Sequence, residues 1–130
     1  MRNRAAQWLL AGITAGSLCL AVACQGGKTE RVYAVFTGGD AGRGRHAIEK
    51  YRCGACHIIP GIHNADGLVG PPLMYWGRRT FIAGEVPNNP ENLERWVRSP
   101  ESIEPGTAMP TLGLTEQESR DVAAYLYTLH

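Results

Sequence analysis

Residues 53–57 read CGACH, and no other stretch of this 130-residue chain restricts its fold as strongly. Two cysteines stand three residues apart, and His57 directly follows the second. On one helical turn, Cys53, Cys56 and His57 project from the same face. Four kinds of site use such a spacing: a disulfide, half of a zinc site, a redox-active dithiol and a covalently attached haem.

The zinc site and the dithiol are poorly supported. Zinc needs about four ligands, usually supplied by two closely spaced pairs. The other cysteines lie near the N-terminus and the other histidines are scattered: Cys19, Cys24, His46, His63 and His130. A redox-active dithiol is expected at the start of a helix that follows a strand, where the helix dipole lowers the thiol pKa. The CGACH sequence instead follows a predicted helix.

A disulfide and a haem both remain after this comparison. A disulfide suits an exported chain, but it gives His57 no role. A haem uses all three residues, because two thiols can form thioethers along one haem edge while the imidazole reaches the iron. The pentapeptide alone also occurs in unrelated proteins, so the spacing favours haem without excluding the disulfide.

The N-terminus has the pattern of an export signal. MRNR precedes a mostly apolar run of 15 residues, WLLAGITAGSLCLAV, whereas a transmembrane helix needs roughly 20. The sequence LAVAC, which ends at Cys24, resembles a bacterial lipoprotein signal, although Leu20 stands one place early. We predict a signal peptide over residues 1–23 and lipidation of Cys24. Secretion with a free Cys24 and an uncleaved anchor are the alternatives.

The composition fits one small globular domain. Apolar residues make up 44% and charged residues 19% of the chain, and this length suffices for one buried core. Loss of residues 1–23 removes Arg2 and Arg4, which leaves 11 basic and 12 acidic residues and changes the formal charge from +1 to −1. A chain with this balance has no basic footprint for nucleic acid.

Two helix starts can be read before residue 100. Asp40 is a suitable N-cap for a helix that runs into CGACH. Asn89 is a second N-cap, with Pro90 in the first helical position, and that helix must stop before Pro100. The segment PLMYWGRR, residues 72–79, can form a short helix.

The strongest helix signal is the last one. Thr115 and Glu118 match a capping box, and apolar residues then follow at helical spacing: Val122, Tyr125, Leu126 and Leu129. Glycine and proline predict a loop over residues 58–72. Residues 24–37 are expected to be a tether that ends in an extended arm over 31–37. With no βαβ unit, the prediction is an all-α domain over residues 38–130.

CGACH, VGPPL and PGTAMP occur in this order, and with them residues 38–130 resemble the class I cytochrome c family. Residues 81–110 are similar to the cytochrome c domains associated with bacterial haem-copper oxidases. The resemblance implies about four to five helices around one haem c, bound covalently through Cys53 and Cys56. It also implies that the helix carrying Gly44, Ile48 and Tyr51 packs against the C-terminal helix.

The resemblance further implies the axial ligands of the haem iron. His57 would be the proximal ligand and Met109, in the PGTAMP loop, the sixth ligand. A core role for Met109, or His63 as the sixth ligand, is the alternative. Pro71 would offer its carbonyl to the other nitrogen of His57, and Leu73 would press on the proximal haem face.

Four more residues receive expectations. Trp96 would lie against the distal haem face, with its N–H directed to a partner such as a haem propionate. Arg79, or in its place Arg78, would pair with a propionate, and a solvated surface charge is the alternative for both. Met74 is expected to pack in the core.

A haem with both axial positions filled has no open site for substrate, so the resemblance implies an electron carrier rather than an enzyme. Its partners would be a donor and an acceptor protein, such as a dehydrogenase or a haem-copper oxidase, on the periplasmic side of a membrane reached through Cys24. One alternative is a fixed haem subunit of a larger membrane complex. The other is a haem sensor or peroxidase with an open sixth position.

Overall fold

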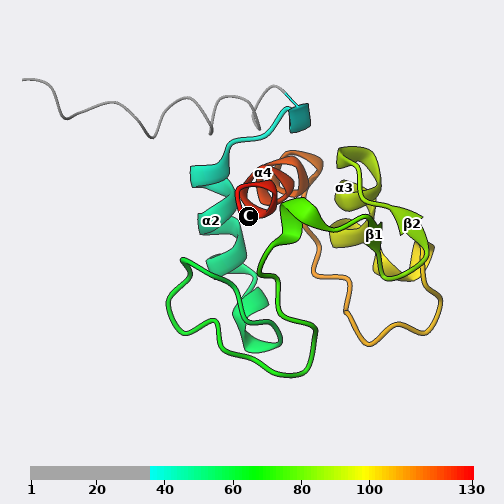
Figure 1. The fold of residues 1–130 in the computed structure, drawn as a ribbon, viewed down its shortest axis with the longest axis horizontal. Helices are drawn as coiled ribbons and strands as arrows, with labels where there is room; N and C mark the ends of the chain where they lie inside the picture. Colours follow the sequence, from blue (N-terminus) through cyan, green and yellow to red (C-terminus); the bar gives the residue numbers. More distant parts are fainter. Residues whose placement is uncertain (1–35) are drawn as a thin grey trace, which may run out of the picture.

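The computed structural model describes residues 36–130, which form three α-helices, three short 3-10 helices and one small hairpin. The elements follow the order α2 (Ala41–Lys50), η1 (Cys53–Ala55), η2 (Trp76–Arg78), β1 (Phe81–Ile82), β2 (Val86–Pro87), α3 (Pro90–Arg98), η3 (Pro100–Ser102) and α4 (Glu116–Tyr127). Figure 1 shows α2, α3 and α4 gathered on one side, with two long connections on the other.

The expected count of four to five helices is not confirmed in this part of the chain. Residues 38–130 contain three α-helices, and the remaining helical pieces there are single 3-10 turns. Short helical turns of this kind serve as connectors. The hairpin was not predicted either. Its strands pair antiparallel with Ile82 opposite Val86, and Ala83 and Gly84 adopt φ values of 53° and 82° in the tight turn between them.

The predicted helix starts are confirmed. The Asp40 side chain accepts a hydrogen bond from the Arg43 backbone N–H at 2.7 Å. Asn89 caps α3 in the same way, and that helix ends at Arg98, before Pro100. Thr115 and Glu118 form the capping box of α4. These caps satisfy backbone N–H groups that have no partner inside the helix.

Helices α2 and α4 pack so closely that their backbones nearly touch. A Cβ atom added at Gly44 would lie 1.9 Å from the carbonyl oxygen of Asp121, and one at Gly39 would lie 2.1 Å from that of Arg120. Any side chain at either position would push α4 away. The predicted pairing of the first helix of the domain with the last is therefore present, and it depends on glycine.

A buried carboxylate links the same two helices. Asp121 is 3% exposed and accepts hydrogen bonds from the Asp40 backbone N–H, from Nε and Nη2 of Arg43, and from the Gln117 amide, at 2.8 to 3.0 Å. Burial alone would raise the pKa of Asp121, but these donors hold that pKa below its ordinary value. Hydrogen bonds from the protein therefore take the place of water around the charged Asp121 carboxylate.

A second polar contact joins the end of α2 to the start of α4 at the surface. Glu118 accepts from Lys50 Nζ at 2.7 Å and from the Tyr51 hydroxyl at 2.9 Å. The hydrogen bond from Lys50, followed by those from Thr115 and Tyr51, lowers the pKa of Glu118 to about 2. Tyr51, which the resemblance placed on the helix that packs against α4, thus also anchors its hydroxyl to the capping box.

The described residues begin at the end of the predicted extended arm. Phe36 and Thr37 are helical rather than extended, and the Phe36 ring meets the Tyr127 ring edge-on, with 5.6 Å between centroids. The signal peptide, Cys24, the tether and the rest of the arm lie outside the described residues. Within residues 36–130, no helix is both long and apolar enough to span a bilayer.

Candidate functional site

A cavity of about 480 Å³ lies between the helices and the two long connections, a size in the range of small-molecule and cofactor sites. Its lining is mostly apolar and includes side chains from α2, α3 and α4, among them Ile48, Leu93 and Leu126. The eight residues predicted for the haem site all line it: Cys53, Cys56, His57, Pro71, Leu73, Arg79, Trp96 and Met109.

The CGACH segment forms one wall of this cavity. Helix α2 ends at Lys50, and Arg52, in a left-handed conformation with φ 55°, precedes the 3-10 turn. The Cys56 and His57 N–H groups both donate to the Cys53 carbonyl, at 3.2 and 3.1 Å. Both cysteines are free thiols, and burial raises the pKa of Cys53. A redox-active dithiol has the opposite feature, a lowered thiol pKa.

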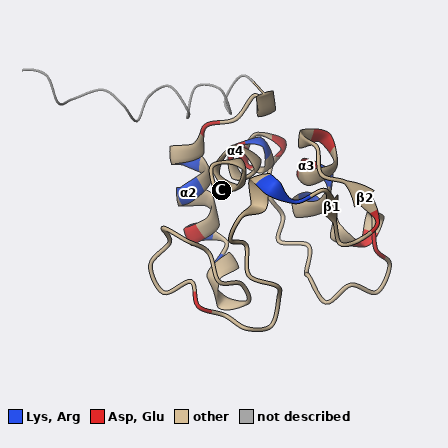
Figure 2. Cartoon of the chain, in the orientation of Figure 1, with Lys and Arg blue, Asp and Glu red and all other residues tan. Residues whose placement is uncertain are grey.

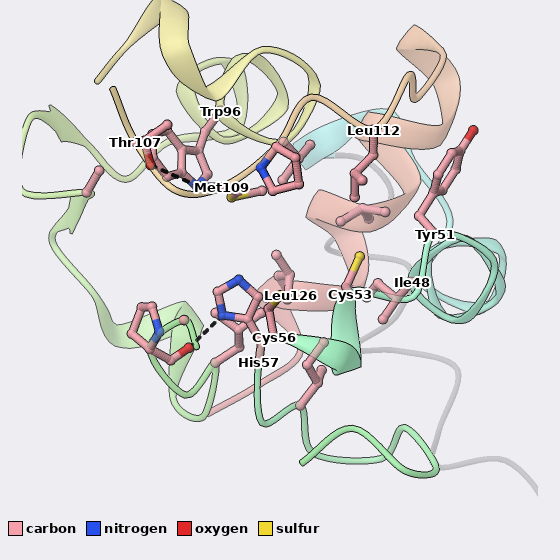
Figure 3. A pocket seen from close by; sticks show the side chains of 18 of the residues that line it. Ile48, Tyr51, Cys53, Cys56, His57, Trp96, Thr107, Met109, Leu112 and Leu126 are labelled. Carbon is pink, nitrogen blue, oxygen red and sulfur yellow. Dashed lines mark hydrogen bonds between the residues drawn. The ribbon is translucent and has the colours of Figure 1, made fainter. Parts of the chain in front are cut away.

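The His57 ring is held in one orientation. Its Nδ1 donates to the Pro71 carbonyl at 2.8 Å, since a carbonyl oxygen can only accept. Nε2 is then the ring nitrogen left to bind a metal, and Figure 3 shows the ring extending into the cavity. The ring lies directly on Gly70, where a Cβ atom would come within 2.2 Å of His57 Cε1. Glycine and Pro71 together fix the imidazole.

Met109 lies on the other side of the cavity, opposite His57 (Figure 3). It belongs to the irregular connection between η3 and α4, and its backbone N–H donates to the Thr107 hydroxyl at 3.3 Å. Trp96, on α3, lies beside it. The structure therefore brings a thioether and an imidazole to facing walls, the arrangement needed for two ligands on opposite sides of one metal.

Two of the other candidates, His63 and Met74, lie outside the cavity. His63 is exposed and is absent from the lining of the cavity. The prediction that Met74 packs in the core is wrong, because Met74 is 41% exposed. It lies between buried Leu73 and Tyr75, whose left-handed φ of 57° turns the chain before η2 begins at Trp76. Trp76, rather than Met74, enters the core.

Trp76 is the site residue that the sequence reasoning missed. It is 5% exposed and lines the cavity, and its indole N–H has no hydrogen-bond partner in the described part of the chain. The sequence analysis instead predicts that the N–H in need of a partner belongs to Trp96. No short pattern distinguishes the two, and only the orientation of each ring within the fold separates them.

Arg79 lies against Trp76. Its guanidinium is 4.9 Å from the centroid of the Trp76 ring and donates to the Pro72 carbonyl. Burial lowers the pKa of Arg79, and no carboxylate in residues 36–130 forms an ion pair with it. The half-buried Arg79 guanidinium and the unsatisfied Trp76 N–H are both donors without an acidic partner. A ligand with a carboxylate at this end of the cavity would satisfy them.

These residues fit a haem. Two thiols and an imidazole stand on one wall and a thioether on the facing wall, which is the donor set of a c-type haem with His and Met ligands. The apolar lining suits a flat macrocycle, and the unsatisfied donors of Trp76 and Arg79 could bind its carboxylates.

Comparison with known proteins gives a consistent answer. The family model described as Cytochrome c matches residues 41–130. Cytochrome c oxidase subunit 2 of Alkalihalophilus pseudofirmus is 38% identical over 90 residues, which cover 68% of this chain and 25% of that protein. Cytochrome c oxidase subunit 2 of Bacillus sp. PS3 is 37% identical over 87 residues, or 64% and 24% of the two chains. The Cytochrome c-type cyt cy of Rhodobacter capsulatus is 35% identical over 100 residues, or 70% and 50%. The chain thus spans between about a quarter and a half of the length of these relatives.

Proposed function

This chain belongs to the cytochrome c family, and from that membership we propose that it carries single electrons between respiratory redox proteins through one haem c. When bound, the haem supplies an iron that changes its charge by one electron. The observation that carries the proposal is the pair His57 and Met109, which face one another across a single cavity. With both positions filled, no site remains where a substrate could bind the metal, which disfavours the sensor and the peroxidase.

Five residues of the chain would attach the haem and bind its iron, each with a separate role. Cys53 and Cys56 would hold the haem through thioether bonds, and His57 Nε2 and the Met109 sulfur would be the protein ligands of its iron. The Pro71 carbonyl keeps the proton on His57 Nδ1, which maintains Nε2 as a strong ligand. Because both ligands are fixed before the metal changes charge, little of the protein has to rearrange.

The remaining lining residues would orient the cofactor and exclude water. Leu73 would pack on the His57 side of the haem, and Trp96 would cover the Met109 side. Trp76 and Arg79 would bind the haem carboxylates, which would supply the acceptor that the indole N–H lacks among residues 36–130. This assignment keeps the earlier expectation for Arg79 and transfers the hydrogen-bonding role from Trp96 to Trp76.

The test is an absorption spectrum of the membrane-extracted protein, reduced and oxidised, with and without carbon monoxide. We expect a c-type reduced spectrum, a weak far-red sulfur-to-iron band in the oxidised state, and no change with carbon monoxide. Met109→Ala should remove the far-red band and allow carbon monoxide to bind, while the matched control Met74→Ala should change neither. Carbon monoxide binding to the wild type would overturn the His57 and Met109 assignment.

A fixed haem subunit of a larger complex is the second candidate. It is favoured by the relatives named cytochrome c oxidase subunit 2, in which the matched segment is about a quarter of a longer chain. Native electrophoresis of mild detergent extracts separates the two candidates. A carrier migrates alone, whereas a subunit migrates with its complex and stays there after a salt wash.

We also propose that Cys24 carries a lipid anchor on the periplasmic side of a membrane. The support is the LAVAC sequence, since Cys24 lies outside the described residues. Labelling cells with a radioactive fatty acid should mark the wild type and leave Cys24→Ser unlabelled. A labelled Cys24→Ser protein would contradict this assignment and leave the haem proposal unaffected.

A further inference from the structure

The side chain of Asn88 closes the short turn that carries Trp76 and Arg79. Trp76 begins the 3-10 turn η2 and Arg79 is its C-cap. The Asn88 amide donates to the Trp76 carbonyl at 3.2 Å and to the Arg79 carbonyl at 3.0 Å. An asparagine amide has two N–H groups, so one group serves each carbonyl. Asn88 therefore links the two backbone positions from which both donors of the cavity wall extend.

Tyr127, on α4, orients the Asn88 amide. Its hydroxyl donates to Asn88 Oδ1 at 2.9 Å, which directs the amide nitrogen to the two carbonyls. Tyr127 is 6% exposed, and burial, followed by the charge of Glu94, raises the pKa of Tyr127 to about 12. The hydroxyl therefore keeps its proton near neutral pH and remains a donor to Asn88.

Helix α4 and the residues after it hold η2 at a second point. Gly77 N–H donates to the Leu129 carbonyl at 2.9 Å, and a Cβ atom at Gly77 would lie 3.0 Å from the Tyr127 carbonyl oxygen. Figure 1 shows this turn, in green, beside the end of α4. Neither Asn88 nor Tyr127 lines the cavity, so a group bound there would meet the turn and not the two residues that hold it.

We propose that Tyr127 and Asn88 are positioning residues that hold the Trp76 N–H and the Arg79 guanidinium against the haem carboxylates and thereby raise the reduction potential of the haem. The inference rests on the proposed function, in which these two donors bind the carboxylates. Donors beside a carboxylate offset its negative charge. A carboxylate without them stabilises the oxidised iron, which carries one more positive charge. Loosening the turn should therefore lower the potential.

The test is a redox titration of the membrane-extracted holoprotein, followed by its absorption spectrum, which gives the midpoint potential. Tyr127→Phe removes one hydroxyl and keeps the buried ring, and we expect it to shift the midpoint to a lower potential. Asn88→Leu removes all three hydrogen bonds of the side chain and should shift the midpoint further in the same direction. The far-red band should persist in both variants, because Met109 is unchanged.

Tyr125→Phe is the matched control. Tyr125 lies on the same helix, and its hydroxyl donates to the Pro60 carbonyl at 2.6 Å. The substitution therefore also removes a hydrogen bond between α4 and a connection of the chain, but one that does not reach η2. Its midpoint potential should equal that of the wild type.

A second background shows whether the effect passes through the two donors. The double variant Trp76→Phe, Arg79→Leu lacks both of them and should itself have a lowered midpoint potential. Addition of Tyr127→Phe to this double variant should cause no further shift. A merely structural role of Tyr127 would give the same shift in both backgrounds, as independent substitutions do.

The outcomes distinguish this inference from the proposed function. The positioning role would be overturned, while the electron carrier stands, if Tyr127→Phe leaves the midpoint unchanged or shifts it equally in both backgrounds. An unchanged midpoint in Trp76→Phe, Arg79→Leu would overturn it as well. A wild-type spectrum without the far-red band would instead contradict the His57 and Met109 ligands, whatever Tyr127→Phe does to the potential.

Discussion

Two regions of the molecule bury polar groups in opposite ways. Between α2 and α4, the Asp121 carboxylate receives donors from Asp40, Arg43 and Gln117. In the cavity, the Trp76 N–H has no acceptor within the described residues, and Arg79 loses water without gaining a carboxylate. Buried polar groups are normally satisfied, so the helix contact is complete within the chain, whereas the cavity wall requires a ligand to complete it.

This difference separates what the sequence folds by itself from what the cofactor must add. A domain of this size has a small core of its own, and here much of the apolar surface of α2, α3 and α4 faces the cavity. Substitutions at the contact between α2 and α4 should lower the stability of the protein and leave its haem content and spectrum as in the wild type. Substitutions in the cavity should alter stability because they change how the haem is bound.

The largest effect is expected when the haem cannot be attached. The double variant Cys53→Ala, Cys56→Ala should show no cooperative thermal unfolding by circular dichroism, because the cavity walls then face water and the helix contact alone is too small a core. The wild-type holoprotein provides the reference transition. A sharp melting transition in the double variant would show that the chain forms its fold without the cofactor.

Gly44→Ala should come next. Its Cβ would collide with the Asp121 carbonyl, so we expect the free energy of unfolding of the holoprotein to fall by about 3 kcal/mol, as in severe overpacking, with an unchanged haem spectrum. Gly42→Ala is the matched control, since Gly42 lies exposed on the same helix. It should be stabilised by about 0.5 to 1 kcal/mol through helix propensity. Denaturant titration gives both values, and equal effects would contradict the close backbone contact.

Trp76→Phe tests the cavity through the direction, rather than the magnitude, of the change in holoprotein stability. If the indole N–H binds a haem carboxylate, its removal should lower the stability of the holoprotein by about 1 kcal/mol, the usual net value of one hydrogen bond. If the N–H stays unsatisfied in the holoprotein, the same change should be neutral or stabilising. Denaturant titration of the holoprotein distinguishes the two, and Trp96→Phe gives the comparison for loss of an indole elsewhere in the cavity.

The smallest effect concerns Glu118 and is set by pH. Its pKa is lowered to about 2 by the hydrogen bonds of Lys50, Thr115 and Tyr51, against about 4.3 in an unfolded chain. The contribution of the charged carboxylate is therefore present above the unfolded pKa and is lost as the pH falls toward 2. Thermal midpoints of wild type and Glu118→Gln should differ near neutral pH and converge in acid. A constant difference across this range would contradict the assignment.

Sequence reasoning succeeded where the controlling interactions are short in range. The caps at Asp40, Asn89 and Thr115 involve partners three residues away, so local residue types suffice to predict them. The turn at CGACH is similarly local. The loop at 58–72 follows from its glycine and proline content.

The misses have long-range causes. The hairpin strands are two residues long each, too short for any alternation to be read, and Ala83 at positive φ is an unusual turn residue. Met74 and Trp76 are close in sequence, and only the chain reversal at Tyr75 decides which is buried. The contact between Arg43 and Asp121 spans most of the domain.

The pairing of α2 with α4 also sets an order of events during synthesis. These helices come from opposite ends of the domain, so the pair cannot close until the last residues have emerged, and such distant contacts form slowly. Chains are made from the N-terminus, and Cys53 and Cys56 appear long before Met109 and α4. The thiols are therefore exposed on an incomplete chain, in which the wall that carries His57 has been synthesised and the wall that carries Met109 has not.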